Sequence, residues 1–294
     1  FRNSSGFGLF ARGRGLPRRG APRAGSCAGI FLLAGMLPLL AQTNFVTLVT
    51  NGPASNRLNV VFLSEGYTSS QLGTFLADAT NSANILLTTA PFAEYAPYLN
   101  CFAIAVASAQ SGSDHPVSMI SRNTYFNSTY GSSDYLMSIP PNEFDANYSN
   151  GQGKVDALLN TFMPAADLAI LLVNDPNIGG SDGGGKTAIA AVSFAVGDIL
   201  LHESGHVLAG LGDEYTTPNS GYPDIEEPNT TRETNRAAIK WNAWISTNTP
   251  VPTPTAYGSA VGLFEGAHYH TTGWYRPKLN CRMSSPFYNA FCEV

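Results

Sequence analysis

Short apolar runs alternate with longer amphipathic segments over the first two thirds of the chain. Apolar runs of β-forming residues predict buried strands, at 58–63, 101–106, 168–173 and 187–193. Apolar residues that recur at helical spacing predict helices, at about 68–88, 154–163 and 197–210. This order of strands and helices predicts a mixed α/β fold, of the α+β kind, built as a sheet covered by helices.

The chain becomes irregular after Gly212. Residues 213–294 are rich in Pro, Asn and Thr, and they show little hydrophobic periodicity. We therefore expect an α/β lobe over 42–212 and an irregular lobe over 213–294, which together form one functional unit.

The first 41 residues have the layout of an export signal. Six of the chain's 16 basic residues are arginines within the first 23 positions, and an apolar run of 14 residues follows at 28–41. A membrane-spanning helix needs about 20 apolar residues, so this run is short for an anchor. We predict a signal peptide over 1–41 and a secreted protein, in the periplasm or outside the cell. An uncleaved membrane anchor is the alternative.

Removal of this segment changes the charge of the protein. The whole chain has 16 basic and 21 acidic residues, a formal net charge of −5. Ten basic residues and all 21 acidic ones lie after position 41, which gives −11. Such an acidic chain argues against a nucleic-acid partner and against an anionic membrane surface. A composition of 44% hydrophobic and 13% charged residues also argues against disorder.

The strongest chemical signal is the H-E-x-x-H pattern formed by His202, Glu203 and His206. Residues four apart lie one above the other on a helix, so both imidazoles can bind one ion, at about 2.0–2.1 Å if it is zinc. Glu203 would then lie beside the ion, where it can take a proton from the attacking water and deliver it to a leaving amine. The pattern predicts a zinc peptidase, and a histidine pair on an ordinary helix is the alternative.

A third ligand is expected close to the end of this helix. Zinc hydrolases bind the ion through three protein ligands and leave the fourth position for water. Gly210 and Gly212 predict the helix end, and a turn beyond it can bring Asp213 back to the ion. Asp213 is the expected ligand, and Glu214 is the main alternative. Later side chains of suitable type remain as further alternatives: Glu226, Glu227, Glu233, His268 and His270.

Residues 202–215 read H-E-S-G-H-V-L-A-G-L-G-D-E-Y, which resembles the zinc motif of the bacterial IgA-peptidase family, a group counted among the metzincins. Segments along most of the body are similar to the same family, at 59–68, 111–114, 262–267, 275–277 and 281–283. The resemblance implies a bacterial zinc endopeptidase. It also implies a metzincin-like αβα sandwich as the N-terminal lobe, with a zinc cleft between the two lobes.

The same resemblance implies roles for single residues. Glu203 would be the general base and acid, one zinc ion the cofactor, and Met283 the methionine of a turn beneath the metal. The common metzincin spacing would put the third ligand at Gly212, one position before Asp213. The implied substrate is a protein or a peptide, and the resemblance does not single out immunoglobulin.

Two other functions are alternatives to the peptidase. Residues 180–187 match the phosphate-binding pattern G-x-x-x-x-G-K-[ST], but a strand is predicted where a helix should begin, and an exported protein meets little ATP. A surface-binding protein without activity is the second alternative. Glu203 argues against it, because a structural zinc site needs no base. In a peptidase, the strand at 188–193 is expected at the sheet edge, where it can pair with an extended substrate.

The remaining candidates are single polar side chains. Tyr269 or Tyr275 could donate a hydrogen bond to the tetrahedral intermediate. Asp175 and Asp182 offer oxygen ligands, but their spacing gives no support to a calcium site.

Three cysteines follow the predicted signal peptide. Cys281 and Cys292 are close enough in sequence for a disulfide, which an exported protein can form. Cys101 lies within an apolar run and is expected to be a buried free thiol.

Overall fold

The computed structural model describes residues 44–287 and 290–294. The signal peptide predicted at 1–41 lies outside the described residues. All of the described residues belong to one compact unit, Leu39–Val294. Within the described part of the chain, no helix is long and apolar enough to cross a membrane.

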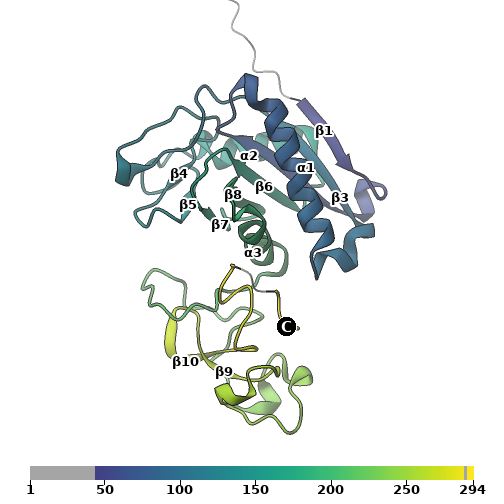
Figure 1. Cartoon of the computed structure of the whole chain (residues 1–294), viewed down its shortest axis with the longest axis vertical. Coiled ribbons are helices and arrows are strands. Elements are labelled where there is room, and N and C mark those ends of the chain that lie inside the picture. The colour runs from purple at the N-terminus through teal and green to yellow at the C-terminus, as the bar shows by residue number, and fades with distance from the viewer. Residues whose placement is uncertain (1–43, 288–289) are drawn as a thin grey trace, which may run out of the picture. The chain divides into compact units, whose positions relative to one another are not determined.

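A six-stranded sheet forms the centre of the described part of the N-terminal lobe, in the order β1-β3-β2-β6-β8-β7 (Figure 1). Its central strands are parallel, namely β2 (Leu58–Glu65), β3 (Leu99–Ala105), β6 (Leu168–Val173) and β8 (Thr187–Ala191). An antiparallel strand lies at each edge, namely β1 (Asn44–Val49) beside β3 and β7 (Gly180–Ser181) beside β8. Every residue of β3, β6 and β8 is buried, as is typical of parallel strands covered on both faces.

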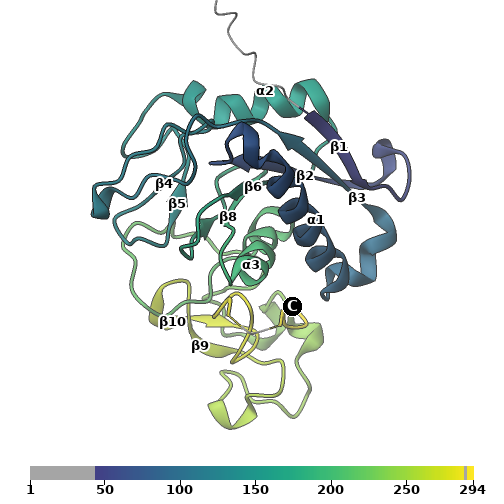
Figure 2. The ribbon, with the colours of Figure 1, turned by 45° about the horizontal axis from the view of Figure 1, so that its top comes forward.

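Helices cover both faces of this sheet (Figure 2). On one face, α1 (Leu72–Thr88) and α3 (Val196–Ala209) contribute to a core that includes Phe62, Phe75, Leu86, Ile170 and Leu200. On the other face, α2 (Gln152–Phe162) and the preceding loops contribute to a core that includes Val61, Phe126, Val155, Leu158 and Leu171. Neighbouring residues of one strand enter opposite cores because side chains alternate across a sheet. The mixed α/β fold predicted from the sequence is confirmed.

Local capping residues set the ends of the helices. Thr68 and Gln71 form a capping box ahead of α1, in which the Thr68 amide donates to Gln71 Oε1 at 3.0 Å. α3 ends at Gly210, whose φ of 63° is the left-handed conformation that glycine adopts without strain. The chain therefore reverses sharply just after the H-E-x-x-H pattern.

Short elements connect these strands and helices. A small antiparallel pair lies in the long loop region, β4 (Thr129–Tyr130) with β5 (Met137–Ser138). The structure also has short 3-10 helices, at Ala54–Asn56, Ser69–Gln71, Phe92–Tyr98, Pro116–Ser118, Tyr148–Asn150, Arg236–Ala238, Asn242–Trp244 and Thr255–Tyr257.

The strand predicted at 188–193 is not the edge of the sheet, and this expectation was wrong. β8 ends at Ala191, and β7 covers its outer side, with Ser181 opposite Ile189. Residues 180–187 comprise β7, the turn at 182–186 and the first residue of β8. The turn contradicts a phosphate-binding loop, since Thr187 begins a strand and Lys186 Nζ donates to the Ala166 carbonyl at 2.8 Å.

The described residues after Gly212 contain three of these short 3-10 helices and one hairpin, which the sequence did not predict. β9 (Phe264–Ala267) pairs with β10 (His270–Arg276). His268 and Tyr269 form the turn with φ values of 54° and 60°, the left-handed values that a two-residue hairpin turn requires. A separate apolar cluster fills the lobe, and it includes Ile239, Trp241, Ile245, Val261 and Leu263.

Glu65 holds the long loop after β3 to the end of β2, and its replacement should destabilise the protein. The fully buried carboxylate accepts hydrogen bonds from Thr124 Oγ1 at 2.5 Å, from the Phe126 amide at 2.9 Å and from the Ser128 amide at 2.8 Å. Burial raises the pKa of Glu65, and these hydrogen bonds oppose the rise. We expect Glu65→Ala to lower the free energy of unfolding by about 3 kcal/mol, because buried donors lose their acceptor.

Urea-induced unfolding measures this change. Glu94→Ala, at an exposed position of a 3-10 helix, is the matched control and should stay within about 0.5 kcal/mol of the parent. Equal losses in the two variants would contradict the role given to Glu65.

Candidate functional site

α3 holds His202 and His206 one turn apart, with their Nε2 atoms 3.1 Å apart. Leu200 and Leu201 of the same helix are buried in the core against the sheet. Ser204 is also buried, and its hydroxyl donates to the Leu200 carbonyl at 2.7 Å. Packing of the apolar side of the helix therefore fixes the direction in which the two imidazoles point.

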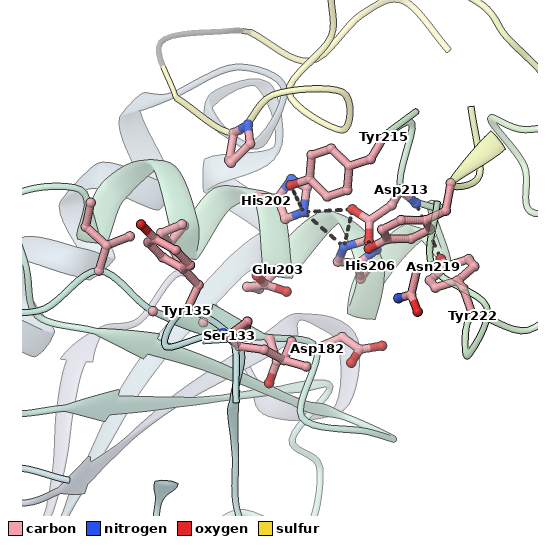
Figure 3. Close-up of a pocket in the computed structure, with 18 of the residues that line it drawn as sticks. Ser133, Tyr135, Asp182, His202, Glu203, His206, Asp213, Tyr215, Asn219 and Tyr222 are labelled. Carbon is pink, nitrogen blue, oxygen red and sulfur yellow. Dashed lines mark hydrogen bonds and ion pairs between the residues drawn. The ribbon is translucent and has the colours of Figure 1, made fainter. Parts of the chain in front are cut away.

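The reversal after α3 brings Asp213 back to the two histidines (Figure 3). Asn229 holds this turn, because its Oδ1 accepts from the Gly212 amide at 2.7 Å and its Nδ2 donates to the Gly212 carbonyl at 2.9 Å. Asp213 Oδ1 lies 3.1 Å from His202 Nε2 and 3.4 Å from His206 Nε2.

A backbone carbonyl orients each imidazole from its other nitrogen. His202 Nδ1 lies 3.1 Å from the Arg282 carbonyl, and His206 Nδ1 lies 2.6 Å from the Leu211 carbonyl. A carbonyl oxygen only accepts, so Nδ1 carries the proton and Nε2 presents a lone pair in both rings. Hydrogen bonds of this kind are the usual support of a metal-binding histidine.

The three atoms that converge fit a metal ion. Tetrahedral coordination at about 2.0–2.1 Å separates ligand atoms by about 3.3 Å. The separations found here are 3.1, 3.1 and 3.4 Å. Apart from these two imidazoles, the buried Asp213 Oδ1 has no hydrogen-bond partner among the described residues. Two lone pairs and a carboxylate oxygen that face one point need positive charge there, which a divalent cation supplies.

The pKa values of these groups reflect the same need for positive charge. Burial opposes the ionisation of Asp213, but the histidines outweigh it and hold the pKa of Asp213 well below its usual value. Burial also opposes the protonation of His206, but the hydrogen bond and charge of Asp213 outweigh it and raise the pKa of His206 to about 9.

Glu203 lies beside this convergence point (Figure 3). Its side chain is 7% exposed, and one carboxylate oxygen lies within 4.8 Å of a ring nitrogen of both His202 and His206. Burial raises the pKa of Glu203 to about 7, the charges of His202 and His206 oppose the rise, and those of Asp213 and Asp182 add to it.

A cavity of about 540 Å³ opens directly onto these groups. β7 and the loop at 133–136 contribute to its wall from the N-terminal lobe, and residues between 213 and 223 contribute from the C-terminal lobe. The wall is partly apolar, through Leu136, Ile178, Ile199 and Phe287, and partly polar, through Ser181, Asp182 and Asn219. The arrangement provides a buried acid beside a cation site that a bound molecule can reach.

Comparison with protein families identifies the chain. A family model described as IgA Peptidase M64 matches residues 46–257 and 255–294. The chain belongs to the IgA peptidase M64 family. It is therefore a peptidase, a hydrolase whose substrate is a protein or a peptide, and the resemblance found in the sequence is confirmed. No curated protein matches the chain.

In this peptidase, Met283 lies under the helix that bears the histidines. The side chain is fully buried, and its Sδ would be 3.3 Å from a Cβ atom on Gly205. The Met283 carbonyl accepts from the Glu214 amide at 2.8 Å. The Met283 segment thus contacts both α3 and the turn that bears Asp213.

The other candidates for a third ligand have different partners. Glu214 is buried, and its Oε1 accepts from Asn229 Nδ2 at 3.0 Å. The later candidates also have partners away from the two α3 histidines. Glu226 pairs with Lys240 Nζ, and Glu227 pairs with His268 Nδ1. Glu233 accepts a hydrogen bond from the Asn235 amide, and His270 Nδ1 contacts the His268 carbonyl.

Two tyrosines contact the converging groups, and only one of them was a candidate from the sequence. Tyr269, at the hairpin turn, donates from its hydroxyl to Asp213 Oδ2 at 2.6 Å. Tyr215 had no assigned role, yet its hydroxyl lies 3.5 Å from His202 Nε2. Its position two residues after the expected ligand Asp213 was the feature of the sequence that could have indicated a place in the site. Tyr275 lies in β10 and is not part of the cavity wall.

Gly205 is required for the packing of the C-terminal segment beneath α3. A Cβ atom there would lie 2.9 Å from the Phe291 ring and 3.3 Å from Met283 Sδ. We expect Gly205→Ala to lower the free energy of unfolding by about 1–3 kcal/mol, although alanine is the better helix former.

The matched control for Gly205→Ala is Gly73→Ala in α1, where a Cβ atom would meet nothing within 4 Å. This variant should be neutral or slightly more stable in urea-induced unfolding. A Gly205→Ala protein as stable as Gly73→Ala would show that the contact is not needed.

Proposed function

We propose that this peptidase is a secreted, zinc-dependent endopeptidase, with residues 1–41 as its signal peptide. His202, His206 and Asp213 would hold one zinc ion, and Glu203 would act as the general base. The observation that carries the proposal is the convergence of two histidine lone pairs and a buried carboxylate oxygen at 3.1–3.4 Å.

The donor set favours zinc. Catalytic zinc sites use three protein ligands, of which histidine nitrogen and carboxylate oxygen are common members. When bound, zinc supplies a Lewis acid that polarises the scissile carbonyl and makes a nearby water more acidic. Asp175 and Asp182 do not converge on this point with the histidines, so a calcium ion receives no support.

Glu203 is placed to move the proton that hydrolysis requires. Its carboxylate would take a proton from the attacking water as the oxygen forms a bond to the carbonyl carbon. It would then deliver that proton to the amide nitrogen as the C–N bond breaks. The products are a carboxylic acid and an amine, so the water is consumed and no other reactant is needed.

Tyr215 and Tyr269 would have different tasks. The Tyr215 hydroxyl beside His202 Nε2 can donate to the negative charge that develops on the carbonyl oxygen. The Tyr269 hydroxyl is engaged by Asp213 Oδ2, so its task would be to position that carboxylate.

The peptide substrate would bind in the cavity between the two lobes. β7 contributes Gly180 and Ser181 to the cavity wall, and it occupies the sheet edge that the sequence assigned to the next strand. The outer side of β7 is partly engaged, since the Gly180 amide donates to the Tyr135 carbonyl at 3.1 Å. An extended peptide would therefore follow β7 beyond that contact, past the wall formed by Ser181 and Asp182.

Glu203→Gln should remove the activity and keep the ion. Glutamine has the same size but cannot accept the proton, so we expect kcat/KM on casein to fall by about 10³-fold. Bound metal, measured by mass spectrometry of the purified protein, should be unchanged at the site.

Asp213→Ala is the companion variant, and it should lose the ion from this site together with the activity. Glu94→Gln, on the surface, should match the parent in both measurements. Full activity in Glu203→Gln would refute the mechanism. A parent protein that is inactive on casein and on immunoglobulin would instead indicate a binding protein without catalysis.

Tyr215→Phe should lower kcat by about 10²-fold and leave KM and bound metal nearly unchanged, because the lost hydrogen bond acts mainly on the transition state. Tyr275→Phe provides the comparison, since Tyr275 is outside the cavity wall. An equal loss in both variants, or a change in KM alone, would contradict the role proposed for Tyr215.

A further inference from the structure

A second cluster of metal-binding side chains lies beside the first. Glu214, Cys281 and Cys292 each place one ligand atom, a carboxylate oxygen or a sulfur, within 4.8 Å of the other two. Glu214 directly follows Asp213 in the chain, but its carboxylate turns toward the cysteines and not toward the histidines. The two cysteines, which the sequence suggested as a disulfide, are free thiols.

Glu214 is the group whose burial needs an explanation. Its side chain is 1% exposed, and only Oε1 is engaged, by Asn229 Nδ2 at 3.0 Å. Oε2 is buried and has no hydrogen-bond partner among the described residues. An unpartnered buried carboxylate oxygen costs about 1–3 kcal/mol or more, so an occupant that binds it is expected.

We propose that Glu214, Cys281 and Cys292 form a second, structural zinc site. Two thiolates and a carboxylate are ligands that zinc accepts, and sulfur selects against calcium and magnesium. Zinc bound to two sulfurs at about 2.3 Å separates them by roughly 3.8 Å, and the three ligand atoms here lie within 4.8 Å of one another. Cys292 is partly exposed, which leaves room for water at the fourth position.

The charges around the cluster support a divalent cation. In the zinc-bound state, two thiolates and the Glu214 carboxylate would bring three negative charges, and zinc would bring two positive ones. Arg276 is close enough to interact with both Glu214 and Cys281, and its guanidinium donates to the carbonyls of Gly266, Lys278 and Leu279 and not to the carboxylate. With the zinc ion and Arg276 included, the buried cluster is neutral.

A disulfide between the cysteines explains less of the structure. It would satisfy both sulfurs and leave Glu214 Oε2 buried beside them without a partner. The Cys292 amide already donates to Cys281 Sγ at 3.3 Å, as backbone amides commonly do toward a metal-bound thiolate.

The second ion would hold in place the two chain segments that support the His202, His206 and Asp213 site. Glu214 adjoins Asp213, and Cys281 adjoins Arg282, whose carbonyl orients His202. The Glu214 amide also donates to the Met283 carbonyl at 2.8 Å, so these two segments already touch. An ion between them would lock both in place.

Cobalt provides a direct test that does not depend on activity. In the full chain reconstituted with Co²⁺, two thiolate ligands produce sulfur-to-cobalt charge-transfer absorption in the near ultraviolet, whereas a site of histidine and carboxylate does not. We expect this absorption in the parent and in Asp213→Ala. It should be absent from a Cys281→Ser, Cys292→Ser double variant and weakened in Glu214→Gln. Cys101→Ser, which removes a buried thiol of β3, should leave it unchanged.

Metal content and thiol counts complete the test. Zinc should amount to about two ions per chain in the parent and about one in either Asp213→Ala or the double cysteine variant. Thiol titration of the unreduced, denatured parent in chelator should find Cys101, Cys281 and Cys292 all reactive. A disulfide would remove two of these thiols and overturn the proposal, as would a parent without the charge-transfer band. Neither of these results would affect the catalytic ion, whose failure would appear as unchanged zinc in Asp213→Ala.

Discussion

Two imidazole lone pairs and a buried carboxylate oxygen face one another in this protein within 3.4 Å, and no arrangement of protons on neutral histidines makes all three contacts favourable. The site needs a cation, and the surrounding structure keeps it ready for one. The carbonyls of Leu211 and Arg282 hold the two rings so that their lone pairs point inward. Those carbonyls come from segments some seventy positions apart, so the irregular C-terminal lobe is needed to form the site.

The C-terminal lobe acts mainly by orienting groups that α3 and the following turn supply. Asn229 holds both the amide and the carbonyl of Gly212, and its side-chain amide also donates to Glu214. Tyr269 holds the second oxygen of Asp213 from the tip of the hairpin. None of these contacts takes part in the chemical step itself. Each restricts a side chain that would otherwise need to be ordered when substrate binds.

The sheet brings one of its edges next to the candidate site. β7 is only two residues long, yet it lies at the sheet edge next to the cavity and against α3, the helix with both histidines. A short edge strand leaves little unpaired backbone with which other chains could pair. Under the proposed function, the same edge would hold an extended peptide substrate.

The sequence by itself determined the central strands, the three α-helices of the described residues and the positions of the two histidines and Glu203, because buried apolar runs and helical spacing are local patterns. It also led to Asp213, since glycines that end a helix are local signals. Only the tertiary structure decided the rest. The β9–β10 hairpin turns at His268 and Tyr269, which lack the usual turn chemistry, and it is held by stacking of His268 on Trp274 and by the bond from Tyr269 to Asp213. The glycine-rich run around β7 gave no strand signal. The contacts of Asn229 with Gly212, of Tyr215 with His202, and of Glu214 with the two cysteines join residues whose spacing in the sequence follows no helical or strand period.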